Sequence, residues 1–396
     1  MIARNEYLNR LISFRDKQLI KVITGIRRCG KSTLLELYRD ALLKRGVQER
    51  QITAINFEDA EFEALMERPA LHSYINDRLL SGKMNYIFLD EIQHVEEWQR
   101  VADSLFIKKH CDVYITGSNA WLLSGELATL LSGRYVEIKM LPLSFSEYVS
   151  AFPDKMELSK KYSAYLTNSS FPYALELNSQ KDIRAYLEGI YTSIILKDVV
   201  KRKRIADVSA LESVIRFMFA NIGNMCSSKK IADTLTSVGR KISVHTVESY
   251  LNALCDSFIL YKAGRYDVKG KQYLKTGEKY YLADIGLRYF LLGAQKADMS
   301  RSLENVIYLE LLRRGYDVWI GKVGNTEIDF IATNENGVEY YQVSLTVRDE
   351  NTLARELFSL DSISDHNLKY LLTLDDDPAA SHNGIRQINA LEWLLA

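Results

Sequence analysis

Residues 25–33, Gly25-Ile-Arg-Arg-Cys-Gly-Lys-Ser-Thr33, fill the glycine-rich phosphate-binding pattern called the P-loop. The segment before it, Gln18–Thr24, is short, apolar and β-branched, and the segment after it, Leu34–Leu43, has apolar residues at helical spacing. A glycine loop between a buried strand and the start of a helix is the context that this pattern requires. The stretch therefore predicts a nucleotide-binding site on an α/β fold.

Each part of this loop has an expected role. The backbone N–H groups of residues 27–32 are expected to surround a β-phosphate, helped by the positive end of the following helix. Lys31 is expected to reach the β- and γ-phosphate oxygens, and the Ser32 hydroxyl is expected to ligate Mg²⁺. ATP and Mg²⁺ are thus the expected ligands. The residues predicted to line the nucleotide are Gly25, Ile26, Arg27, Arg28, Cys29, Gly30, Lys31, Ser32 and Thr33.

A second apolar segment, Asn85–Ile92, ends in the two carboxylates that a P-loop ATPase needs. Asp90 is expected to hold the water shell of Mg²⁺, and Glu91 is expected to polarise the water that attacks the γ-phosphate.

A third predicted strand, Val113–Asn119, ends in polar residues. Sheets of this type bind ligands at the carboxyl edge of their strands. Ser118 and Asn119 are therefore expected to contact the γ-phosphate or to orient the water. The alternative is a capped turn before the next helix.

Four stretches carry a family resemblance: residues 25–33, Leu89–Trp98, Thr116–Asn119 and Ser132–Tyr148. Together they resemble the prokaryotic AAA+ ATPases that carry a C-terminal domain of unknown function related to PD-(D/E)xK nucleases. In such ATPases an arginine of one subunit completes the site of its neighbour, and Arg134 matches it by position. The resemblance thus implies a homo-oligomer. The alternative is that Arg134 is only a surface residue at the end of a helix.

Composition narrows the class of protein. Lys plus Arg and Asp plus Glu both number 51, so no overall charge draws the chain to nucleic acid or to membrane. No apolar run approaches the roughly 18 residues of a membrane span, and the first residues lack a signal-peptide core. The four cysteines form no CxxC pair, and the six histidines show no metal-ligand spacing. We therefore expect a cytoplasmic protein with no membrane partner and no zinc.

The 396 residues suit several domains. The predicted fold is an AAA+ P-loop domain with a parallel sheet (1–150), a helical lid (151–205), a winged-helix domain (206–295) and an α/β nuclease-like domain (296–396). The winged helix is predicted from a helix with a serine cap at Ser227, a recognition helix at Ser243–Leu254 and the hairpin that follows. Six basic and two acidic residues lie between Lys262 and Lys279. They favour phosphate contacts with DNA, and protein contacts are the alternative.

The last hundred residues resemble the core of PD-(D/E)xK nucleases, in which a helix Glu, a strand Asp and a Glu-x-Lys gather Mg²⁺ and a water. Glu304 and Asp329 match the first two places, but Gln342-Val-Ser344 stands where Glu-x-Lys belongs. Gln342 brings no negative charge to a metal, and Ser344 supplies no ammonium. The pattern predicts a degenerate domain that does not cut, unless a lysine such as Lys322 enters from elsewhere.

These features together predict a Mg²⁺-dependent ATPase that acts on DNA. One alternative is a nucleotide-gated switch or scaffold that binds protein partners, and another is an ATP-dependent nuclease. DNA stimulation of the ATPase rate separates the first two, and metal-dependent cutting identifies the third.

Overall fold

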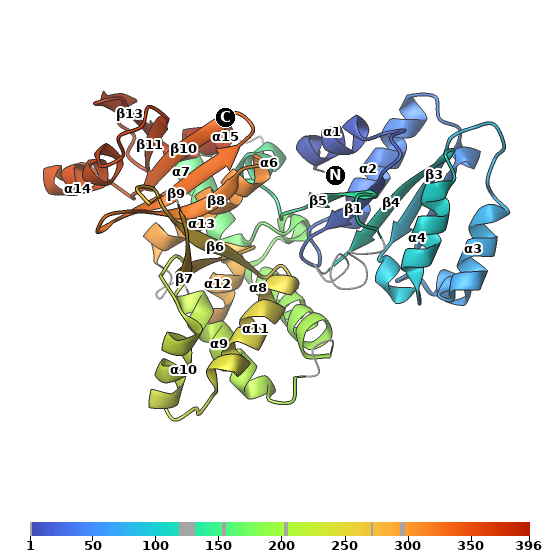
Figure 1. Ribbon diagram of the computed structural model, residues 1–396, viewed down its shortest axis with the longest axis horizontal. Helices are drawn as coiled ribbons and strands as arrows, with labels where there is room; N and C mark the ends of the chain where they lie inside the picture. The colour runs from blue at the N-terminus through green and yellow to red at the C-terminus, as the bar shows by residue number, and fades with distance from the viewer. Residues whose placement is uncertain (1, 119–130, 153–155, 202–204, 271, 294–297) are drawn as a thin grey trace. The chain divides into compact units, whose positions relative to one another are not determined.

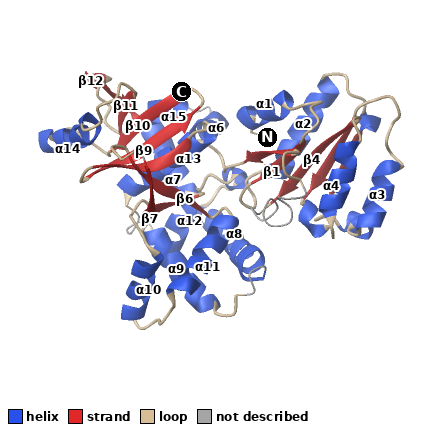
Figure 2. Cartoon of the chain, in the orientation of Figure 1, coloured by secondary structure: helices blue, strands red, loops and turns tan. Residues whose placement is uncertain are grey.

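The computed structural model describes residues 2–118, 131–152, 156–201, 205–270, 272–293 and 298–396 (Figures 1 and 2). The chain forms two compact units. The first is Met1–Pro142 with Asp256–Phe258, and the second is Leu143–Cys255 with Ile259–Ala396.

The first unit is built on a parallel five-stranded sheet with the strand order β2-β3-β4-β1-β5. The three strands predicted from the sequence are present, and they lie side by side in the middle of this sheet. Their carboxyl ends therefore meet at one edge, where the P-loop begins. The strands are β1 (Ile20–Thr24), β2 (Ile52–Asn56), β3 (Asn85–Asp90), β4 (Cys111–Gly117) and β5 (Tyr135–Lys139).

Helices cover both faces of this sheet, because alternate side chains of its buried strands point to opposite sides. On one face, apolar side chains of β1, β3 and β4 pack with α3 and α4. On the other face, Tyr38 of α2 packs against Phe88 and Tyr114, with ring centroids 4.9–5.9 Å apart. The helices of this unit are α1 (Asn5–Ser13), α2 (Lys31–Lys44), α3 (Arg68–Asn76) and α4 (Trp98–Ile107).

The second unit begins with helices. The predicted cap at Ser227 is confirmed, because its side chain accepts a hydrogen bond from the backbone N–H of Lys230 at the start of α10. Helices that precede the C-terminal strands are α6 (Phe145–Ala151), α7 (Leu158–Asn168), α8 (Gln180–Ser193), a π-helical stretch (Ile194–Lys201), α9 (Val208–Ala220), α10 (Ser228–Ser237), α11 (Val244–Asp256), α12 (Ile285–Leu292) and α13 (Met299–Arg313).

A mixed eight-stranded sheet with the order β12-β13-β11-β10-β9-β8-β6-β7 forms the rest of this unit. The parallel pairing of β6 with β8 makes the hairpin β6–β7 part of the same sheet as the C-terminal strands, so the sheet crosses the domain boundary predicted at residue 295. The strands are β6 (Leu260–Asp267), β7 (Gln272–Leu282), β8 (Asp317–Val323), β9 (Thr326–Asn334), β10 (Gly337–Val343), β11 (Leu368–Thr373), β12 (Ala380–His382) and β13 (Ile385–Asn389).

Two apolar layers hold the helices to this sheet. Side chains of α14 (Glu350–Asp361), among them Leu360, join one cluster with residues of β9, β10 and β11. Elsewhere on the sheet, Tyr308 of α13 stacks on Tyr281 with ring centroids 4.1 Å apart, and both rings lie 5.8 Å from Phe330. The last helix is α15 (Ala390–Leu395).

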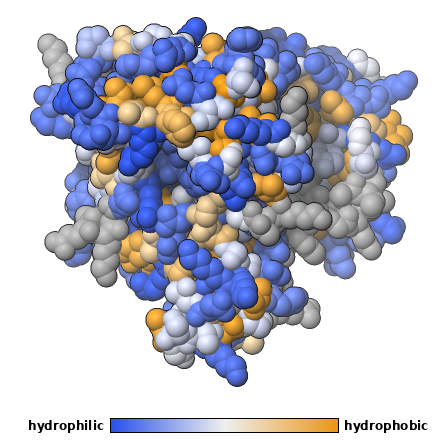
Figure 3. All heavy atoms as spheres, turned by 60° about the vertical axis from the view of Figure 1, so that its left-hand side comes forward, coloured by the Kyte–Doolittle hydropathy of each residue, from blue (hydrophilic) through white to orange (hydrophobic). Residues whose placement is uncertain are grey.

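Hydrophilic residues dominate the face shown in Figure 3, with smaller hydrophobic groups between them. In the described part of the chain, no helix combines the length and the apolar character that a membrane crossing requires.

Candidate nucleotide site

The P-loop follows β1 directly, and two of its glycines are required by the backbone. A side chain at Gly25 would place its Cβ 2.2 Å from the carbonyl oxygen of Met140. Gly30 has φ +101° and lies immediately before α2, in a region that other residues rarely adopt. The loop can therefore pass close to neighbouring backbone and turn sharply into the helix.

Lys31 is the first residue of α2, and its side chain lies within the loop. Its Nζ donates hydrogen bonds to the carbonyl oxygens of Gly25 (3.1 Å) and Ile26 (3.3 Å). Glu91 Oε1 lies 3.7 Å from the same ammonium. Lys31 is 4% exposed, so its charge is held at a defined point of the site.

Asp90 ends β3 beside the start of α2. It accepts a hydrogen bond from the side chain of Thr116 in β4, and a second from Ser32. Burial raises the pKa of the Asp90 carboxyl, although the bonds from Ser32 and Thr116 act in the opposite direction. The predicted pair of magnesium residues is thus brought together by two adjacent elements.

Glu91 follows Asp90 in a left-handed conformation, with φ +53° and ψ 45°. Its backbone N–H donates to Thr116 Oγ1 at 2.9 Å, so a single threonine contacts both acidic residues. Burial alone would raise the pKa of Glu91, but the Lys31 charge and the hydrogen bond from Gln93 outweigh it and lower that pKa. Glu91 is therefore held as a carboxylate, the form that can accept a proton from water.

Ser118 comes just after β4, at the same edge of the sheet. It is 1% exposed, and its Oγ has no hydrogen-bond partner among the described residues. A buried hydroxyl without a partner is costly unless a ligand or water satisfies it. Asn119, the other residue predicted here, lies outside the described residues.

These features fit a nucleotide with Mg²⁺. Gly25 carries no side chain where the loop passes Met140, Lys31 supplies a fixed positive charge, and the buried Ser118 hydroxyl has no partner among the described residues. Ser32 and Asp90 offer the oxygen ligands that Mg²⁺ prefers.

Two family models match the chain: an AAA domain over residues 17–149, and a domain of unknown function (DUF8612) over residues 159–298. An uncharacterized protein of Haemophilus influenzae is 42% identical over 399 residues, which cover 100% of this chain and 99% of that protein. The uncharacterized protein MJ1544 of Methanocaldococcus jannaschii is 31% identical over 356 residues, which cover 84% of this chain and 76% of that protein. The chain belongs to this family of AAA-domain proteins. The predicted P-loop ATPase domain is thereby confirmed as an AAA domain.

Two solved structures show more distant similarity. The Walker-type ATPase PABY2304 of Pyrococcus abyssi aligns with a TM-score of 0.48 and 17% identity, covering 74% of this chain and 96% of its own. The Orc1 protein of Aeropyrum pernix, solved in complex with DNA, aligns with a TM-score of 0.34 and 13% identity, covering 79% and 94%. At these scores the similarity carries no argument about function.

The loop arginines of the AAA domain differ in their surroundings. Arg27 pairs with Glu58 beyond the end of β2, whereas Arg28 is exposed and has φ +69°. A further arginine was missed by the sequence analysis. Arg4, which is 3% exposed, donates to the carbonyl oxygens of Cys29 (3.0 Å) and Leu141 (2.7 Å), so it ties the P-loop to the chain beyond β5.

Arg134 lies at the amino-terminal edge of the AAA sheet, whereas the P-loop lies at the carboxyl edge. Its carbonyl oxygen accepts a hydrogen bond from the N–H of Ile20 at the start of β1, whereas the P-loop leaves the end of that strand. Five strand residues separate the two edges by about 16 Å. The Arg134 side chain pairs with Asp103 and lies over the Phe106 ring, 5.5 Å from its centroid. The structure thus does not bring Arg134 to the nucleotide site of its own chain.

The predicted nuclease-like residues lie close together in the second unit. Asp329 Oδ2 accepts from the N–H of Val343 (2.9 Å), and the N–H of Asp329 donates to Gln342 Oε1 (3.3 Å). The Ser344 hydroxyl points elsewhere and donates to the carbonyl oxygen of Thr346 (3.1 Å).

A lysine does enter this group, but it is Lys279 of β7 and not Lys322. Its ammonium lies 2.9 Å from Glu304 Oε1, 2.8 Å from Glu327 Oε1 and 3.9 Å from Asp329 Oδ1. Burial lowers the pKa of Lys279, but the three carboxylates outweigh it and raise that pKa, while burial and the Glu304 charge raise the pKa of Asp329. In the described part of the chain, no group of three or more His, Cys, Asp or Glu side chains is placed to hold a metal ion.

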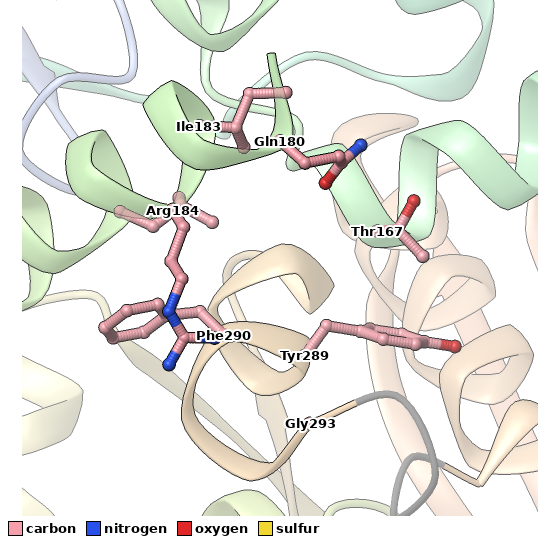
Figure 4. Close-up of a pocket in the computed structure, with 8 residues that line it drawn as sticks. Thr167, Gln180, Ile183, Arg184, Tyr289, Phe290 and Gly293 are labelled. Atoms are coloured by element: carbon pink, nitrogen blue, oxygen red, sulfur yellow. The ribbon is translucent and has the colours of Figure 1, made fainter.

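A pocket of about 430 Å³ lies between α7, α8 and α12 of the second unit (Figure 4). Arg184 in its wall lies over the Phe290 ring, with its guanidinium carbon 5.4 Å from the ring centroid. This cation is thus engaged by the wall itself, and we assign no ligand to the pocket. The other lining residues are Thr167, Gln180, Ile183, Leu187, Tyr289 and Gly293.

Proposed function

We propose that the chain hydrolyses ATP with Mg²⁺ at the carboxyl edge of the AAA sheet. The observation that supports this most directly is the convergence of Lys31, Asp90 and Glu91 at the P-loop. The Lys31 ammonium donates to the loop carbonyl of Gly25 and lies 3.7 Å from Glu91, and Asp90 accepts a hydrogen bond from Ser32 of the loop. A site that only stored nucleotide would not need a buried carboxylate held ionised next to the phosphate clamp.

Each side chain has a distinct part in this proposal. Lys31 binds the terminal phosphates, and Glu91 accepts the proton of the attacking water. The Thr116 hydroxyl holds both acidic residues in place, because it donates to the Asp90 carboxylate and accepts from the backbone N–H of Glu91. Mg²⁺ held by Ser32 and Asp90 would neutralise charge on the phosphates. The Ser118 hydroxyl would donate to the γ-phosphate or to the water.

Replacing Glu91 with glutamine is expected to slow hydrolysis by a factor of about 10² to 10⁴, the usual contribution of a general base. The amide has nearly the same shape but cannot take the proton, so ATP binding with Mg²⁺ should remain close to wild type. Steady-state hydrolysis and titration with a fluorescent ATP analogue measure the two effects. Glu96→Gln, which changes an exposed glutamate five residues farther along the chain, is the matched control. Equal loss of binding and hydrolysis would make Glu91 a structural residue.

We further propose that residues 206–295 form a winged helix that brings DNA to the ATPase. The order α9, α10, α11 and then the hairpin β6–β7 supports it, as does the hairpin's excess of basic residues. Lys269 is exposed near the turn of this hairpin, and Tyr273 is 66% exposed on β7. Cations and exposed aromatic rings are the groups that contact phosphates and bases.

Double-stranded DNA is therefore expected to raise the ATPase rate, and the increase should fall as salt rises because phosphate contacts are screened. Lys269→Glu should reduce the stimulation and leave the rate without DNA unchanged. Lys181→Glu is the matched control, because Lys181 is an exposed lysine of α8 outside the proposed winged helix. A rate that ignores DNA at every salt concentration would instead support the nucleotide-gated switch that binds protein partners.

A further inference from the structure

A buried cation of the chain itself lies in the centre of the carboxylates that resemble a nuclease metal site. Lys279 is 4% exposed, and its ammonium is within 3 Å of both Glu304 and Glu327, with Asp329 slightly farther away. These four side chains come from β7, α13 and β9. We call them the Lys279 cluster.

The surroundings of the Lys279 cluster engage both oxygens of Glu304 and one oxygen of Asp329. The Tyr281 hydroxyl donates to Glu304 Oε1 at 2.7 Å. A Cβ at Gly223 would lie 3.0 Å from Glu304 Oε2, so the backbone of that glycine closes over the other oxygen. Asp329 Oδ2 is held by the Val343 N–H. Water ligands, which Mg²⁺ retains in most protein sites, would have to displace these contacts.

Gln342, at the third position of the nuclease pattern, uses its amide oxygen and nitrogen in other hydrogen bonds. Gln342 accepts the Asp329 N–H through Oε1 and donates through Nε2 to Glu356 Oε2 at 2.8 Å. Its amide therefore links β9 to α14 and has no oxygen directed at the carboxylates. The group does not fit a divalent ion, in contrast to what the nuclease resemblance implies.

We propose that the Lys279 ammonium is the permanent counter-ion of this cluster and takes the place of a divalent metal. The entry of this lysine therefore does not restore a cutting site, because its ammonium pairs with the carboxylates that would hold the metal. The C-terminal sheet then needs no metal to fold, binds none at this position and does not cut DNA. The ion pairs fasten the hairpin β6–β7 to α13 and β9, and the continuous sheet also connects the hairpin to β9 through β8. This inference concerns the second unit only and does not depend on ATP hydrolysis by the first.

Binding of Mn²⁺ to the full-length protein without nucleotide tests the proposal directly, with electron paramagnetic resonance as the readout. We expect the wild-type protein to bind no Mn²⁺ at this position. Lys279→Met, which removes the ammonium and keeps the side chain's length, should gain one Mn²⁺ per chain, and Lys279→Met with Asp329→Asn should lose it again. One Mn²⁺ per wild-type chain that disappears in Asp329→Asn would overturn the proposal. So would nicking of supercoiled plasmid that disappears in the same variant.

Thermal unfolding provides a second test if Lys279→Met folds poorly. Removing one partner of a buried ion pair is strongly destabilising, so its melting temperature should fall by roughly 10 °C. Adding Glu304→Gln to Lys279→Met removes one excess negative charge and should recover part of that loss. Lys262→Met is the matched control, because Lys262 pairs with Glu278 on the neighbouring strand and remains half exposed. A Lys279→Met protein as stable as the control would show that the ammonium is not a required counter-ion.

Discussion

Replacing Lys31 with alanine is expected to abolish ATP hydrolysis and to weaken nucleotide binding about 10- to 100-fold. The side chain places a buried positive charge among the loop carbonyls and next to Glu91. Loss of that charge removes the charge-assisted bonds to the β- and γ-phosphates and leaves the Glu91 carboxylate without its nearest cation. Both losses are expected to affect ATP hydrolysis and nucleotide binding.

Lys44→Ala is the matched control for this experiment, because it removes an exposed lysine from the last turn of the same helix. Circular dichroism should show that both variants keep the helical content of the wild type, while calorimetry measures ATP binding and phosphate release measures turnover. Wild-type turnover in the Lys31→Ala protein would contradict an ATPase site at this loop.

Features encoded within a short stretch could be predicted from the sequence. The strands β1 and β3 are mostly apolar and buried along their whole length, as expected for parallel strands buried on both faces. Gly25 and Lys31 have a fixed spacing because one loop must surround one phosphate. The serine cap of α10 was likewise visible, since a cap involves residues only three apart.

Features that depend on distant parts of the chain were not predicted. No role for Thr116 could be predicted, because only the pairing of β3 with β4 brings it to both acidic residues. Arg4 is separated from Cys29 by an entire helix and strand. Lys279 reaches Glu304 and Asp329 because β6 pairs with β8, and no motif signals that pairing. Lys322, the lysine named from sequence, is nearer in the chain to Asp329 but makes no such ion pair among the described contacts.

The continuous sheet of the second unit limits how ATP hydrolysis could be coupled to movement. The hairpin proposed to contact DNA is hydrogen-bonded to β8 and fastened by the Lys279 cluster. A relative motion of the hairpin against the C-terminal strands would break both sets of contacts. We therefore expect the hairpin and these strands to move as one body.

If Arg134 acts in the site of an adjacent copy, replacing it with alanine should lower ATP hydrolysis by a factor on the order of 10³ and leave nucleotide binding unchanged, as for other arginine fingers. Arg134 lies at the amino edge of the sheet, opposite the P-loop of its own chain, where it pairs with Asp103. An arginine there cannot reach the γ-phosphate of its own chain, so an effect on hydrolysis would have to arise at the site of an adjacent copy.

Mixing variants distinguishes this action between subunits from a structural role. An Arg134→Ala chain keeps Lys31 and Glu91 but lacks the arginine, whereas a Glu91→Gln chain keeps the arginine and lacks the base. Where the two chains meet, the intact site of the first receives the arginine of the second, so activity should return in the mixture. Asp103→Asn is the matched control, because it breaks the same ion pair and retains Arg134. If Asp103→Asn loses as much activity as Arg134→Ala, and mixing restores none, Arg134 only holds β5 to α4.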